Sequence, residues 1–320
     1  MMIRKRGMFA FILMTVLVGI TAAQTPAPAP APATVPDTVY VLATVTGPKK
    51  APAPGLKAEN FQLFEDGVEQ KITSFSAADG LWDINIILAS STLIAGPADR
   101  TYISVHEAVD TFKKTSNPGA KVKIDELKFG SDGLFAAIDR NLVDLQQSRN
   151  PRKALIVITD GFDRHFTSAA PGFSGDANEK TGGEAANKLI EFTKRLSIPI
   201  YFMYSDTGGI DAPHTNLELS GRGGQPAAGT PRDLADKDAL TTVADQTGGA
   251  FTTGNQLTQL EPQLKLLAEE LRNKYVLGFK STNDKQDDKW RKLKVTLKAP
   301  SGPKLDIAVK SKYFVSKPTK

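Results

Sequence analysis

Apolar residues between positions 79 and 260 follow two alternating patterns. Strongly apolar runs occur at Ile84–Leu88, Ala154–Thr159 and Ile198–Tyr204, as in strands that are covered on both faces in a parallel sheet. Between these runs the apolar residues recur every three or four positions, as on one face of a helix. The clearest example of helical spacing is Leu134, Ile138, Leu142 and Leu145. The alternation predicts an α/β domain over residues 79–260, with a Rossmann-like, doubly wound, mostly parallel sheet.

The residues on either side of this domain have β patterns. In residues 37–78, Asp66-Gly67 is a strong hairpin signal, and we expect the returning strand to run from Val68 to Phe75. Residues 261–320 begin with a helical pattern and continue with strand-like runs. Those runs are Tyr275–Phe279, Leu293–Leu297 and Leu305–Val309. We expect the N-terminal β segment and the strands of the C-terminal helix and β segment to pair into one small β domain.

The N-terminus has the layout of a signal peptide over residues 1–23. A positive stretch, Arg4 to Arg6, precedes a short apolar run and the small residues before Gln24. Residues 24–36 are rich in Pro and Ala, which is typical of an extended linker. We therefore expect an exported protein, in the periplasm, in the cell envelope or secreted. An uncleaved signal segment is the alternative, and it would be the one contact with a membrane.

Charge and cysteine content exclude several functions. Removing the three positive residues of the N-terminus lowers the formal net charge from +5 to +2, so nucleic acid is not the partner that composition indicates. The chain has no cysteine, which excludes disulfides and thiolate chemistry. We expect a protein partner instead.

Polar clusters follow the predicted strands where ligands bind in parallel α/β sheets, outside the carboxyl ends. They are Ala89–Thr92, Gly130–Gly133 and Thr159–Gly161. Two long segments rich in Gly, Ala, Pro, Ser and Asp, residues 162–184 and 205–235, also follow apolar strands. Long loops at such an edge point to function or disorder.

These motifs together resemble the von Willebrand factor type A (VWA) domain. The resemblance rests on Arg152–Gly161, on the Gly130 segment that leads into Leu134–Ile138, and on Ile198–Tyr201. The flanks are similar to VWFA-related proteins frequent in acidobacteria, through the segments Phe64–Ile72, Lys274–Phe279 and Trp290–Val295. The likeness runs from about residue 37 to 316 and implies a six-stranded sheet with a metal-ion-dependent adhesion site.

The chain departs from the site that the family implies. Ala89 stands where the first Asp is expected and Leu93 where the second Ser is expected. Ser91 matches the first Ser, and Asp160 matches the Asp of the third loop. Asp132 takes the place of a Thr in the second loop, although a shift of one residue would put Ser131 there. The metal ligands that remain for a degenerate site are Ser91, Asp132 and Asp160.

Two physical readings of this site stay open. Asp132 could replace the lost carboxylate, so that the three residues hold a weak Mg²⁺ or Mn²⁺ site completed by water. Alternatively the metal is lost, Asp160 caps its own loop and Asp132 is the N-cap of the helix that begins at Leu134. We favour loss of the metal and expect no cofactor, because an octahedral ion tolerates missing ligands poorly.

The predicted function is protein–protein interaction without catalysis, through loops at the carboxyl edge of the sheet. The residues predicted to line the partner-binding edge are Ser90, Thr92, Ser131, Asp163 and His165. A structural or envelope-assembly scaffold without metal is the first alternative. A hydrolase with Ser91, His165 and Asp160 is the second, but no Gly-x-Ser-x-Gly turn surrounds Ser91.

Overall fold

The computed structural model describes most of the chain after the predicted linker. The described residues are 38–78, 80–90, 100–115, 121–127, 133–160, 186–205, 237–254, 259–298 and 304–317. Among the helices of these residues, none combines the length and the apolar character needed to cross a bilayer. The predicted signal peptide and linker lie outside the described residues.

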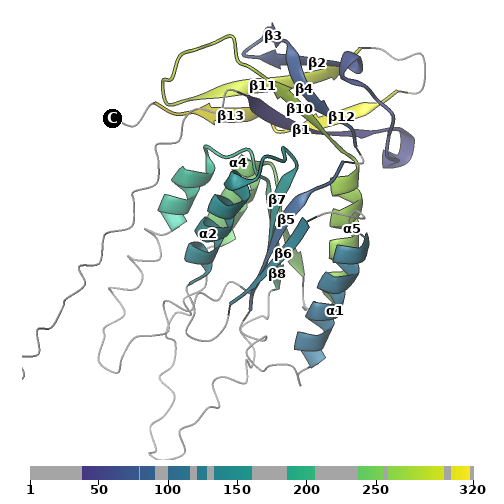
Figure 1. Cartoon of the computed structure of the whole chain (residues 1–320), viewed down its shortest axis with the longest axis vertical. Helices are drawn as coiled ribbons and strands as arrows, with labels where there is room; N and C mark the ends of the chain where they lie inside the picture. The colour runs from purple at the N-terminus through teal and green to yellow at the C-terminus, as the bar shows by residue number, and fades with distance from the viewer. Residues whose placement is uncertain are drawn as a thin grey trace, which may run out of the picture.

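A five-stranded parallel sheet forms the centre of the molecule (Figure 1). Its strands, in spatial order, are β6 (Lys121–Glu126), β5 (Asp83–Ala89), β7 (Lys153–Thr159), β8 (Ile200–Ser205) and β9 (Ala250–Gly254). The three central strands are buried along almost their whole length. This burial explains their strongly apolar sequences and confirms the predicted fold class.

Helices cover both faces of the parallel sheet. On one face lie α1 (Arg100–Thr115) and α5 (Leu260–Arg272). On the other lie α2 (Leu134–Gln147), the helical residues 186–193 and α4 (Lys237–Thr247). α5 packs beside α1 in this layer and so belongs to the α/β domain. The residues that join the flanking β structure therefore begin after α5.

The flanking segments form a β-sandwich of two antiparallel four-stranded sheets. The first sheet has the order β12 (Asp306–Val309), β1 (Val39–Thr46), β10 (Lys274–Phe279), β4 (Ile72–Ser76). The second has the order β13 (Lys312–Val315), β11 (Lys289–Leu297), β2 (Phe61–Glu65), β3 (Val68–Gln70). Short 3-10 turns lie at Pro48–Lys50 and Ala58–Asn60. Side chains of both sheets share one core, so the predicted pairing of the two flanks is confirmed.

One predicted strand is wrong. The residues Val68–Phe75 do not form a single returning strand, because the chain leaves one sheet at Lys71 and enters the other. β3 pairs with β2, whereas β4 pairs with β10. The hairpin itself is confirmed, since Asp66 and Gly67 both have positive φ, at 47° and 88°.

Arg152 joins the sandwich to the amino edge of the parallel sheet. Its guanidinium donates to the carbonyl oxygens of Ala77 and Lys274 and, over 2.9 Å, to the hydroxyl of Ser76. It also lies 5.3 Å from the ring centroid of Trp82. Because Trp82 and Arg152 directly precede β5 and β7, the sandwich sits at the amino ends of these strands and the carboxyl ends face the opposite way (Figure 1).

Candidate functional site at the carboxyl edge of the sheet

The strand order contains one topological switch point, between β5 and β7. The chain passes from β5 to β6 on one side, then returns to β7 on the other side and continues outward through β8 to β9. The connection from β5 to β6 contains α1, which covers one face of the sheet. The connection from β6 to β7 contains α2, which covers the other face. Open α/β sheets bind ligands outside the carboxyl ends at such a point. The residues that follow β5 and β7 are Ser90 and Asp160.

Ser90 and Asp160 contact each other across the switch point. The register of the two strands pairs Ala89 with Thr159, which brings the next residue of each strand side by side. The Ser90 hydroxyl donates to a carboxylate oxygen of Asp160 over 3.0 Å. Only 2% of Ser90 and 4% of Asp160 is exposed. Ser90, predicted as a partner contact, therefore lies beneath the edge surface and fixes the Asp160 carboxylate.

A further hydroxyl at this edge was missed in the sequence. Ser205 ends β8, and the pairing of Thr159 with Tyr204 places it beside Asp160. The Ser205 Oγ is buried and has no hydrogen-bond partner within the described residues. A polar residue directly after the apolar run Ile198–Tyr204 was the available signal. Beside it, the Lys237 ammonium lies 4.7 Å above the Tyr204 ring.

The remaining predicted edge and metal residues cannot be placed by the structure. They are Ser91, Thr92, Ser131, Asp132, Asp163 and His165, all outside the described residues. Ala89 and Leu93 stand where the family has metal ligands, and Ala89 is the one among the described residues. It ends β5, and its methyl group is buried in the core beneath α2. The side chain at this position therefore has no oxygen that could bind a metal ion.

The N-cap position of α2 is Gly133, which has extended backbone, φ −68° and ψ 169°, and no side chain that could cap the helix. Asp132, predicted as the N-cap, precedes this position and lies outside the described residues. Burial of Leu134 and Phe135 stabilises the first turn of α2.

The described residues alone do not fit a divalent cation. They contain no group of three or more Asp, Glu or His side chains placed to hold a metal ion. At the switch point they supply one carboxylate, Asp160, which already accepts a hydrogen bond from Ser90. Mg²⁺ requires about six oxygen ligands in near-octahedral geometry. Water can supply several of these ligands, but the described residues contribute one carboxylate, and Ser91 and Asp132 lie outside them, so no chemistry is assigned to a metal here.

Two solved structures are similar to this chain, while no protein-family model and no curated protein sequence matches it. One is a von Willebrand factor type A protein from Catenulispora acidiphila, 11% identical, with 88% of this chain and 73% of that chain covered and a TM-score of 0.35. The other is an aerotolerance-related membrane protein from Bacteroides fragilis NCTC 9343, studied with multiple mutations to serines. It is 12% identical, with 60% of this chain and 98% of that chain covered and a TM-score of 0.27.

The central domain has a Rossmann-like, doubly wound fold, which is consistent with a VWA domain. Its strand order with one switch point and its helix layers on both faces define this class. The class fixes the architecture and leaves the function to be argued from the site.

Proposed function

We propose that the protein is exported and binds another protein, without catalysis and without metal, through the loops at the carboxyl edge of its VWA-like domain. The observation that carries the proposal is the Ser90–Asp160 contact at the topological switch point. The segments after β5, β7 and β8 all start from this edge, and the sandwich occupies the opposite edge. The signal-peptide pattern of residues 1–23 supports export.

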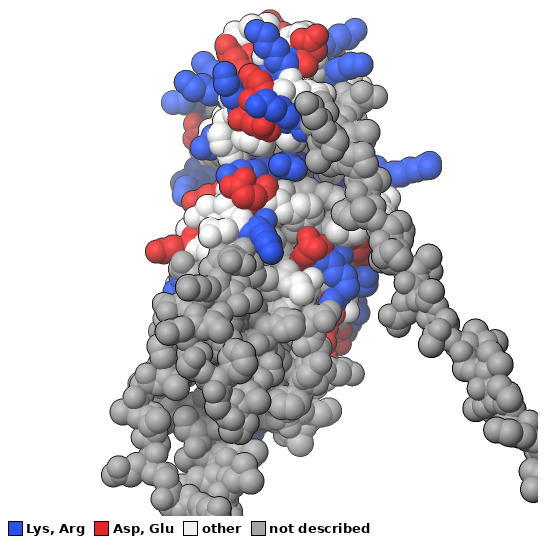
Figure 2. All heavy atoms as spheres, turned by 90° about the vertical axis from the view of Figure 1, so that its left-hand side faces the viewer, with Lys and Arg blue, Asp and Glu red and all other residues white. Residues whose placement is uncertain are grey.

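A protein is a better candidate partner than a nucleic acid. On the face shown in Figure 2, Lys and Arg side chains are interspersed with Asp and Glu, and neither sign forms a continuous stripe over the described residues. A nucleic-acid site needs such a basic stripe to neutralise successive phosphates. Loops carried on a rigid parallel sheet, by contrast, are a frequent position for protein recognition.

The edge can be tested with a triple variant and a matched control. The edge variant replaces Thr92, Asp163 and His165 with alanine, and the control replaces the exposed sandwich residues Thr73, Lys280 and Asp284 with alanine. Partners are first identified by cross-linking to the wild type in an envelope extract. We expect the edge variant to bind these partners about tenfold or more weakly, since a few contacts carry most of the binding energy. The control should bind as the wild type does. Equal capture by all three proteins would contradict the proposal.

Metal independence can be measured on the same proteins. We expect partner capture to be unchanged when Mg²⁺ or Mn²⁺ is replaced by a chelator, because the described edge residues supply too few ligands. Calorimetric titration of either ion into the wild type and into Asp160→Ala should show no specific heat in either protein. Heat of binding that appears in the wild type and vanishes in the variant would establish a metal site instead.

A further inference from the structure

The second sheet of the sandwich has one face turned away from the rest of the molecule. The first sheet contacts the α/β domain, since Leu42 of β1 packs against the core beneath α1 and α5, and Lys274 of β10 forms a 2.8 Å ion pair with Glu270 of α5. The second sheet lies on the far side of the sandwich core (Figure 1). Alternate residues of its long strand β11, Arg291, Leu293 and Val295, point into that core.

The outward residues of this sheet include three lysines in one small area. Lys292 of β11 and Lys312 of β13 are directly opposite each other, and Lys294 lies two residues further along β11. All three side chains are exposed. Like charges directly opposite on neighbouring strands destabilise a sheet. We call the exposed face formed by these residues and Phe64 the lysine face.

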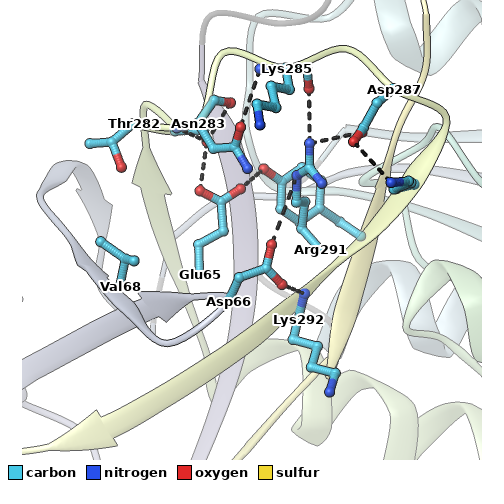
Figure 3. Close-up of polar contacts among 12 residues, drawn as sticks. Glu65, Asp66, Val68, Thr282, Asn283, Lys285, Asp287, Arg291 and Lys292 are labelled. Carbon is cyan, nitrogen blue, oxygen red and sulfur yellow. Dashed lines mark hydrogen bonds and ion pairs between the residues drawn. The ribbon is translucent and has the colours of Figure 1, made fainter.

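Three acidic residues near the lysine face are engaged elsewhere (Figure 3). A fourth, Glu69, is exposed on the same face of the sheet opposite Phe64 and accepts a 3.4 Å hydrogen bond from Gln62. Glu65, which is 2% exposed, accepts hydrogen bonds from Ser281, over 2.6 Å, and from Tyr313. Asp287 accepts from Arg291 over 2.8 Å. Asp66 accepts from the backbone of Lys292, and its other oxygen lies 3.9 Å from Arg291. Figure 3 shows the Lys292 side chain directed away from this network.

Within the described residues, none of Lys292, Lys294 and Lys312 forms an ion pair. Lys312 instead lies 4.7 Å above the ring of Trp290.

A groove lies between these lysines. Its volume is about 750 Å³, and its lining consists of Phe64, Gly67, Lys292, Leu293, Lys294, Ser311 and Lys312. The lining contains no acidic residue, and Phe64 gives it an apolar surface. A groove of this volume accommodates a ligand of several hundred daltons, which corresponds to a few residues of a peptide.

We propose that the lysine face binds an acidic peptide segment of a partner protein, whose carboxylates pair with Lys292, Lys294 and Lys312. The charge of the face and the groove between the lysines select such a ligand. A sugar polymer is less well matched, because the Trp290 ring is already in contact with Lys312 and with Phe314, whose centroid is 5.4 Å away. The lysine face is distant from the carboxyl edge, so failure of one proposal leaves the other intact.

The test is fluorescence anisotropy with a labelled peptide of alternating Glu and Gly. The full-length protein should bind it with an affinity that falls as ionic strength rises. Replacing Lys292, Lys294 and Lys312 together with glutamine should weaken binding about tenfold, as expected for the loss of three exposed ion pairs. Replacing the same three residues with arginine should retain binding, because the charge remains.

A second triple variant controls for net charge. Lys114, Lys188 and Lys265 are exposed lysines on helices of the α/β domain, and their replacement with glutamine should leave affinity unchanged. Equal thermal midpoints for the variants would confirm that all are folded. The proposal is overturned if the peptide shows no salt-dependent binding, if both glutamine triples lose affinity equally, or if oligogalacturonate or anionic phospholipid vesicles bind more tightly than the peptide.

Discussion

Replacing Arg152 with methionine is expected to lower the free energy of unfolding by about 3 kcal/mol, because buried carbonyl groups lose a charged donor. Arg152 is 1% exposed. It donates to the carbonyl oxygen of Ala77, between β4 and β5, and to that of Lys274 in β10, two segments that are far apart in the sequence. Methionine fills much of the volume but donates no hydrogen bond. Arg152→Lys should recover only part of the loss, since one ammonium cannot reproduce the planar set of donors. Urea denaturation followed by circular dichroism measures the difference.

Arg149→Met is the matched control for this prediction. Arg149 is three residues away and exposed, so its replacement should change the stability by no more than about 0.5 kcal/mol. If Arg152 holds the sandwich to the parallel sheet, a protease should also cleave Arg152→Met between these two parts earlier than it cleaves the wild type. Equal denaturation midpoints for the two variants would show that Arg152 does not hold the two parts together.

Gly249→Ala is expected to destabilise the protein by about 3 kcal/mol or more, because the new methyl group would overlap the backbone of Ile200. A Cβ at this position would lie 1.9 Å from the carbonyl oxygen of Ile200 and 2.5 Å from its carbonyl carbon. No side-chain rotation relieves this overlap. The start of β8 or the turn after α4 would have to move, and both contribute to the buried core beneath α4.

Gly47→Ala provides the comparison for Gly249. The nearest atom to a Cβ at Gly47 is a methyl carbon of Leu305 at 3.7 Å, an ordinary van der Waals distance. We expect its thermal midpoint to stay within a few degrees of the wild type, which corresponds to less than about 1 kcal/mol in a chain of this size. A Gly249→Ala protein that melts with Gly47→Ala would show that the backbone shifts at little cost.

The parallel sheet was predictable because its signals are local. Helical spacing at Leu134–Leu145 and the apolar run Ala154–Thr159 gave α2 and β7 nearly to the residue. α4 ends directly before Gly248, a residue type that commonly ends helices and here has φ +81°. Asn85 interrupts the apolar run of β5 without changing the outcome. Its amide donates over 2.9 Å to the Asn141 side chain of α2 and over 2.9 Å to Asp144, which leaves the buried group satisfied.

The sandwich was less predictable because its pairing is between distant parts of the chain. Nothing near Lys71 in the sequence indicates that β3 and β4 belong to different sheets. β13 went unnoticed in a lysine-rich tail, since its pairing with β11 defines it more than its own alternation does. Likewise, the strand-end rule anticipated that Ser90 and Asp160 would be near each other. It did not give the burial of Ser90, which depends on the direction of its side chain.

The sandwich has a consequence for the order in which the chain folds. Its first strand, β1, lies between β10 and β12, which follow more than 200 residues later, at Lys274–Phe279 and Asp306–Val309. During synthesis from the N-terminus the parallel sheet can form first, whereas β1 has no partner from the C-terminal segment until β10 is available. Pairing over such sequence separations is slow. The sandwich therefore forms only after its C-terminal strands are available, and a chain cut short before β10 would leave the β1 edge open to other chains.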